Sequence, residues 1–108
     1  IKMFAKVYNL RFPSVADAKI AASYFADNLG GLIVDCQIQS LNISLGQCGS
    51  LTIQTKFESS ERLRSFELKS SNIFKEIKQS FAFTENHYVG VYTYAYEAEA
   101  VDAKVSAN

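Results

Sequence analysis

Residues 51–81 contain the feature that most constrains the fold of this chain, a half-buried strand that runs directly into an amphipathic helix. Apolar and polar residues alternate over 51–57, except at Thr55, as they do in a strand with one buried face. Ser59 and Ser60 can cap a helix, and Glu61 suits its first turn. Apolar residues then recur at roughly helical spacing, at Leu63, Phe66, Phe74, Ile77 and Phe81. A strand joined to a helix in this way is half of a two-layer α+β unit.

Three other segments have the composition of strands, and they occupy residues 3–12, 32–43 and 87–97. In the last of these, Val89, Val91, Thr93 and Ala95 form a small, smooth face suited to packing under helices. The tyrosines Tyr88, Tyr92, Tyr94 and Tyr96 project from the other face.

Local signals also predict where the helices begin and end. Ser14 and Asp17 form a capping-box pattern, which predicts that the first helix begins there. The pair Gly30-Gly31 predicts its end, because glycine accepts the left-handed conformation that often follows a helix. Ser70-Ser71-Asn72 favours caps over helix interiors, so we expect a break in the second helix.

The predicted order is β-α-β-β-α-β, which is typical of a ferredoxin-like α+β fold. It implies a four-stranded antiparallel sheet with two helices on one face. We expect one domain over residues 1–97 and a loose C-terminal tail over 98–108. Because the first and last strands have apolar residues on both faces, we also expect a homodimer formed by packing of the free sheet faces.

The charge balance argues against two classes of partner. Eleven basic and eleven acidic residues give zero net charge. Phosphate backbones and anionic membrane surfaces attract basic domains, so we expect neither nucleic acid nor a membrane as partner. No apolar run has transmembrane length and no signal-peptide pattern is present, which predicts a cytoplasmic protein.

Two short motifs and the element order carry a resemblance to a known family. Residues 55–59 read Thr-Lys-Phe-Glu-Ser, and Ser70-Ser71 is followed by Phe74. This pattern resembles the antibiotic-biosynthesis-monooxygenase type of dimeric α+β barrel domain. Members of this family end the third strand on an aromatic residue, an acidic residue and a serine. Along their second helix they have a leucine, an aromatic residue, a serine and a phenylalanine, and this chain has the same types in the same order at Leu63, Phe66, Ser71 and Phe74.

The resemblance implies either cofactor-free oxygenation or haem degradation. Haem-degrading members place a histidine one turn after the position of Phe74, where this chain has residues 75–78, Lys-Glu-Ile-Lys. They also use a tryptophan where this chain has Phe57, and the chain contains no tryptophan. We therefore expect no haem or other cofactor. We expect no metal site either, because His87, Cys36 and Cys48 have no ligand spacing.

The candidate site residues are Tyr8, Asn9, His87, Tyr92 and Tyr94. Tyrosine hydroxyls and an asparagine could orient a flat aromatic ligand, such as a phenol or quinone, and a lone histidine could act as an acid or base. By parity, Lys6 and Lys56 could share the tyrosine face. The alternative is that the tyrosines pack a dimer interface, where this residue type is enriched.

Three functions are compatible with these features. The first is a small dimeric oxygenase-like enzyme that acts on an aromatic compound. The second is a homodimeric ligand-binding or structural domain without catalysis. The third is an RNA-recognition motif, which shares the element order; it would require paired aromatics on the third strand, where Thr52 and Gln54 stand instead.

Overall fold

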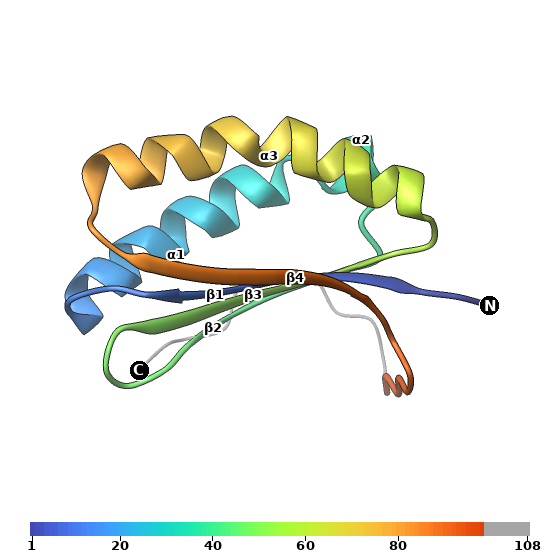
Figure 1. The fold of residues 1–108 in the computed structure, drawn as a ribbon, viewed down its shortest axis with the longest axis horizontal. Coiled ribbons are helices and arrows are strands. Elements are labelled where there is room, and N and C mark those ends of the chain that lie inside the picture. Colours follow the sequence, from blue (N-terminus) through green and yellow to red (C-terminus); the bar gives the residue numbers. More distant parts are fainter. Residues whose placement is uncertain (99–108) are drawn as a thin grey trace.

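Four strands form one antiparallel sheet, and the helices lie on one side of it (Figure 1). The computed structural model describes residues 1–98. The strands are β1 (Phe4–Arg11), β2 (Ser40–Leu45), β3 (Ser50–Phe57) and β4 (Thr84–Val91), and the helices are α1 (Val15–Gly30), α2 (Ile33–Cys36) and α3 (Ser60–Ser80). The strand order in the sheet is β2-β3-β1-β4. This arrangement confirms the predicted ferredoxin-like fold. Of the predicted tail, residues 99–108 lie outside the described residues.

Two serine caps fix where the long helices begin. The Ser14 hydroxyl accepts a hydrogen bond from the Asp17 amide at 3.1 Å, and the Ser59 hydroxyl accepts one from the Arg62 amide at 3.2 Å. Each bond satisfies a backbone donor that has no partner inside the helix. Both predicted helix starts are therefore confirmed.

The segment after α1 corrects the prediction of one continuous strand over residues 32–43. Residues 33–36 form the short helix α2, and pairing with β3 begins only at Ser40. A short apolar run fits a buried helical turn as well as a strand, so its composition did not distinguish them. The left-handed residue here is Gln37, with a φ of 52°, whereas Gly31 has an ordinary helical φ of −68°.

The second long helix and the last strand also differ from their predicted extents. α3 runs through Ser70 and Ser71 without a break. The Ser71 hydroxyl donates to the Leu68 carbonyl at 2.9 Å, so its polar group is satisfied within the helix. The last strand covers residues 84–91 instead of the predicted 87–97. The reason is that β1 begins at Phe4, which pairs with Val91, so residues after Val91 have almost no strand to pair with.

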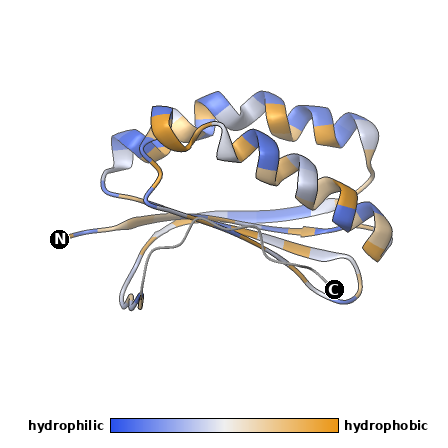
Figure 2. Cartoon of the chain, turned by 180° about the vertical axis from the view of Figure 1, so that it is seen from behind, coloured by the Kyte–Doolittle hydropathy of each residue, from blue (hydrophilic) through white to orange (hydrophobic). Residues whose placement is uncertain are grey.

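The core lies between the sheet and the helices. Its largest fully buried apolar side chains come from every layer: Phe25, Leu29, Leu51, Ile53, Phe57 and Phe66. Aromatic rings connect these layers, with centroids 5.3 Å apart for Phe57 and Phe66 and 5.0 Å apart for Phe25 and Phe74. Hydrophobic and hydrophilic residues alternate around both long helices, as expected for helices with one buried face (Figure 2). No helix within residues 1–98 is long and apolar enough to cross a membrane.

The sheet face turned away from the helices has two distinct halves. The strand register places Ala5, Val7, Tyr88 and Gly90 on one half, which we call the tyrosine half. The same register places six polar residues on the other, which we call the polar half: Asn9, Arg11, Ser50, Thr52, Thr84 and Asn86. After β4 the chain turns toward this side of the sheet (Figure 1), where Glu97 forms an ion pair with Lys56.

Candidate functional site

A buried lysine lies between the sheet and α3, in a group of polar side chains that we call the Lys6 cluster. Its members are Lys6, Tyr8, Glu67, Ser70 and His87. Lys6 is on the helix side of the central strand β1, where only 6% of its side chain is exposed. Opposite it in β3, the Thr55 hydroxyl donates to the Lys6 carbonyl at 2.8 Å.

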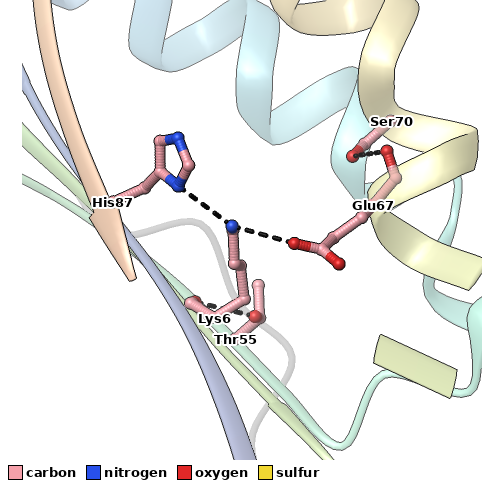
Figure 3. Close-up of polar contacts among 5 residues, drawn as sticks. All are labelled: Lys6, Thr55, Glu67, Ser70 and His87. Carbon is pink, nitrogen blue, oxygen red and sulfur yellow. Dashed lines mark hydrogen bonds and ion pairs between the residues drawn. The ribbon is translucent and has the colours of Figure 1, made fainter. Parts of the chain in front are cut away.

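The Lys6 ammonium joins α3 to β4, as Figure 3 shows. Its Nζ lies 2.9 Å from Oε2 of Glu67 and 3.0 Å from Nδ1 of His87. An ammonium group can only donate, so Nδ1 of His87 accepts this bond. The proton of the neutral imidazole is then on Nε2, which leaves His87 as a hydrogen-bond donor toward any ligand.

Tyr8 supplies the aromatic wall of the cluster. Its ring stacks on Phe74 with centroids 4.4 Å apart and lies 5.9 Å from the His87 ring. The Lys6 Nζ is 5.3 Å from the Tyr8 ring centroid, within cation–π range. Burial raises the pKa of the Tyr8 hydroxyl well above its usual value, and a hydrogen bond with Ser70 lowers it by less.

The outer strand β4 leaves one side of the cluster accessible. α3 contacts β1 and β3, whereas Val89 and Val91 on the helix side of β4 are 54% and 48% exposed. We call His87, Val89 and Val91 the β4 strip. It is an apolar surface beside a buried ammonium, a combination suited to a flat molecule with one anionic oxygen.

The structure separates the five residues that the sequence grouped into one site. Tyr8 and His87 lie together in the Lys6 cluster. Asn9 lies on the opposite face of the sheet, where its Oδ1 accepts from the Thr52 hydroxyl at 3.1 Å. Strand alternation requires this separation, because Asn9 directly follows Tyr8.

The two remaining tyrosines lie past the end of β4. The Tyr92 hydroxyl donates to the Thr55 carbonyl at 3.2 Å, and the Lys56 Nζ lies 5.8 Å from its ring centroid. Burial raises the pKa of Tyr92, while the charge of Lys56 lowers it to a smaller extent. Tyr94 is 83% exposed. A ligand-binding role for Asn9, Tyr92 and Tyr94 stays a prediction.

Sequence reasoning missed Lys6 and Glu67. Lys6 is predicted on the tyrosine face, and Glu67 is not among the predicted site residues. The parity of strand β1 carried the signal for Lys6, since Phe4, Tyr8 and Leu10 share its face. A lysine in such a row requires an acidic partner on the covering helix, and Glu67 is that partner.

The described residues contain no group of three or more histidine, cysteine or carboxylate side chains that could hold a metal ion. Cys36 is buried and Cys48 is exposed, and both are free thiols. The Lys6 ammonium and the His87 Nε2–H are hydrogen-bond donors that suit an anion, whereas the Glu67 carboxylate competes with an anion for the ammonium.

Comparisons with known proteins found matches only in structure. No protein-family profile and no curated protein matches the chain. A dimeric ferredoxin-like protein from an uncultured marine organism superposes with a TM-score of 0.73 at 7% identity, covering 89% of this chain and 100% of that one. The monooxygenase from ActVA-Orf6 of Streptomyces coelicolor, solved with the ligand nanaomycin D, gives 0.72 at 11% identity and covers 91% and 94%.

A third structure extends the same likeness. A Deinococcus radiodurans protein, described as a candidate antibiotic biosynthesis monooxygenase, gives a TM-score of 0.64 at 12% identity and covers 92% and 99%. Identities this low establish a shared fold and nothing finer. The chain therefore has the ferredoxin-like α+β fold that is found both in dimeric proteins of this type and in antibiotic-biosynthesis-type monooxygenases.

Proposed function

We propose that the protein is a homodimeric, cofactor-independent oxygenase whose substrate is a flat aromatic compound with an acidic hydroxyl group. The observation that carries the proposal is the Lys6 ammonium, which is buried beside Tyr8 and next to the exposed apolar residues of the β4 strip. The structural likeness to a monooxygenase that was solved with nanaomycin D supports the same class of substrate.

The Lys6 cluster can stabilise a substrate anion. The ammonium would pair with the deprotonated oxygen of a phenol or enol, and it would lower the pKa of that hydroxyl by charge attraction. The His87 Nε2–H can donate to a second oxygen of the substrate. The ring of the substrate would lie on Val89 and Val91, which supply apolar contact.

An electron-rich anion of this kind can react with dioxygen without a cofactor. For a ring methylene that is conjugated with a carbonyl through the aromatic rings, as in an anthrone, the methylene carbon becomes a new carbonyl, one oxygen atom of O₂ enters it, and the other leaves as water. The substrate supplies all four electrons. The chain would contribute charge stabilisation and positioning, which are the main ways an enzyme lowers such a barrier.

A specific observation favours the second candidate, a homodimeric ligand-binding or structural domain. Every buried polar side-chain atom within residues 1–98 already has a hydrogen-bond partner in the chain. Glu67 in particular occupies the ammonium that a substrate anion would require. A cluster satisfied in this way also stabilises a fold with no chemistry at all.

Charge variants of the cluster test the proposal with dihydroxyanthrone as the probe. Lys6→Met should abolish binding, measured by fluorescence titration, because it removes the positive charge while keeping an apolar stem of similar size. Glu67→Gln should raise the affinity several-fold, because it removes the anion that competes for Lys6. Glu61→Gln, on the exposed surface of the same helix, is the matched control and should change nothing.

Oxygen uptake distinguishes enzyme from binding domain. The wild-type protein should consume one O₂ per probe molecule in an oxygen electrode, and Lys6→Met should reduce the rate to the background. Tight binding without oxygen uptake would support the non-catalytic candidate. Retained binding by a folded Lys6→Met protein, checked by its melting temperature, would refute the Lys6 cluster as the site.

A further inference from the structure

The polar half of the open sheet face is organised as two rows across three strands. Thr52, Asn9 and Asn86 are paired side by side in the first row, and Ser50, Arg11 and Thr84 in the second. All six side chains are polar, and the only charge among them is the central Arg11 guanidinium. Strand neighbours lie about 5 Å apart, so these groups converge on a small area.

A hollow of about 520 Å³ lies over these two rows. Besides the six polar residues it is lined by Leu10 and Glu85, whose register places their side chains on the helix side of the sheet. The Glu85 carboxylate is engaged there by Lys78, 2.7 Å away. The charge that faces the hollow is therefore the positive charge of Arg11.

The partners of the two open-face cations differ. Lys56, on the opposite side of the face, forms an ion pair with Glu97. Within residues 1–98, Arg11 forms no ion pair. Its planar fork of donors remains available and matches the two oxygens of a carboxylate.

We propose that the polar half binds a small hydroxycarboxylate, with Arg11 as its anchor. The guanidinium holds the carboxylate in a bidentate contact. The Ser50 and Thr84 hydroxyls flank Arg11. Hydroxyl and amide groups both donate and accept, so this lining also satisfies a hydroxyl group on the ligand, which a surface of donors alone would not. The site lies on the opposite face of the sheet from the Lys6 cluster and is independent of the proposed oxygenase activity.

Amide chemical shifts in the full chain provide the test, with malate as the probe. Malate should shift the Thr52 and Asn86 amide signals and leave that of Glu67 unchanged. Succinate, which lacks the hydroxyl, and inorganic phosphate should each bind several-fold more weakly. Arg11→Gln should weaken malate binding about tenfold, the loss expected for one charge-assisted bidentate contact. Arg64→Gln, an exposed arginine on α3, is the matched control and should keep wild-type affinity.

Four outcomes would overturn the proposal. If malate caused no saturable change in the amide chemical shifts, the proposed site would be refuted. Equal losses of malate affinity in the Arg11 and Arg64 variants would show that malate is attracted only by the net charge of the protein. Equal affinity for succinate or phosphate would refute selection for a hydroxycarboxylate. A change of molecular mass in Arg11→Gln, measured by light scattering, would show that Arg11 serves subunit contact instead of ligand binding.

Discussion

Tyr8 shows how a single position can matter to both packing and chemistry. Its ring is part of the core, stacked on Phe74, while its hydroxyl belongs to the Lys6 cluster. The surroundings that hold the ring also disfavour a phenolate, since burial and the nearby carboxylates Glu67 and Glu85 all oppose a negative charge. Tyr8 therefore remains a neutral hydroxyl at any physiological pH.

This shift predicts how stability depends on alkaline pH. An unfolded tyrosine ionises near pH 10, whereas folded Tyr8 keeps its proton, so ionisation favours the unfolded chain. The contribution of Tyr8 is fully present below pH 10 and is lost as the pH rises above it, by up to about 1.4 kcal/mol per pH unit. In Tyr8→Phe, the free energy of unfolding should decline less steeply above pH 10.

Urea unfolding at several alkaline pH values measures this difference. Tyr94→Phe, which alters a tyrosine that is 83% exposed, should keep the wild-type slope. If the free energy of unfolding of the wild type and of Tyr8→Phe declined equally with pH above pH 10, the claim that folded Tyr8 keeps its proton would be contradicted.

At this scale the sequence predicted proximity better than orientation. The first and last strands pair in this fold, and their register brings together Tyr8 and His87, two of the five grouped residues. Asn9 was grouped with Tyr8 although strand alternation puts it on the opposite face of the sheet. Lys6 shares its face with Tyr8 and not with Tyr88, so parity placed it correctly beside only one of these two tyrosines. The partnership of Lys6 with Glu67 required the angle at which α3 crosses the sheet, and no local pattern encodes that angle.

Among the elements, the β3–α3 unit was the most predictable. Its alternation, its serine cap and its helical spacing are all local, and all are present in the structure. Even Thr55, an apparent flaw in the alternation, is fully buried and bonded through its hydroxyl to Lys6. The limits of β4 were not local, because they depend on where β1 begins.

The turn between β2 and β3 gives a prediction at the element scale. Gly49 has a φ of 86°, and a Cβ atom added there would lie 2.5 Å from the Phe12 carbonyl oxygen. Gly49→Ala should therefore lower the free energy of unfolding by about 1–3 kcal/mol. Gly30→Ala, at the end of α1, meets no atom within 4 Å and should raise it by about 0.5 kcal/mol.

Denaturant unfolding monitored by circular dichroism compares the two glycine variants directly. The two substitutions add the same methyl group, but they should change the free energy of unfolding in opposite directions. A Gly49 variant as stable as the wild type would show that the turn can adopt another conformation.

For the molecule as a whole, the tyrosine half predicts how two copies associate. Tyr88 is 54% exposed on the open sheet face, and Ile20 is 60% exposed on α1. If the tyrosine halves of two copies pack together, the wild type should have about twice the 12.0 kDa mass of one chain in light scattering. Tyr88→Glu should then yield monomers, because it places a charge inside the apolar contact.

Ile20→Glu is the matched control, since it alters a similar exposed apolar residue on the opposite side of the molecule. It should leave the dimer intact. Dissociation by the Ile20 variant alone would place the contact on the helices, and a monomeric wild type would contradict the dimer altogether.

The strand order also determines when the protein can finish folding during synthesis. The central strand β1 comes first in the chain, and one of its two neighbours, β4, comes last. Until residue 91 has left the ribosome, a full edge of β1 has no hydrogen-bonding partner. Nascent chains that end before β4 should therefore bind chaperones and resist compaction, and the sheet should close only after β4 has emerged from the ribosome.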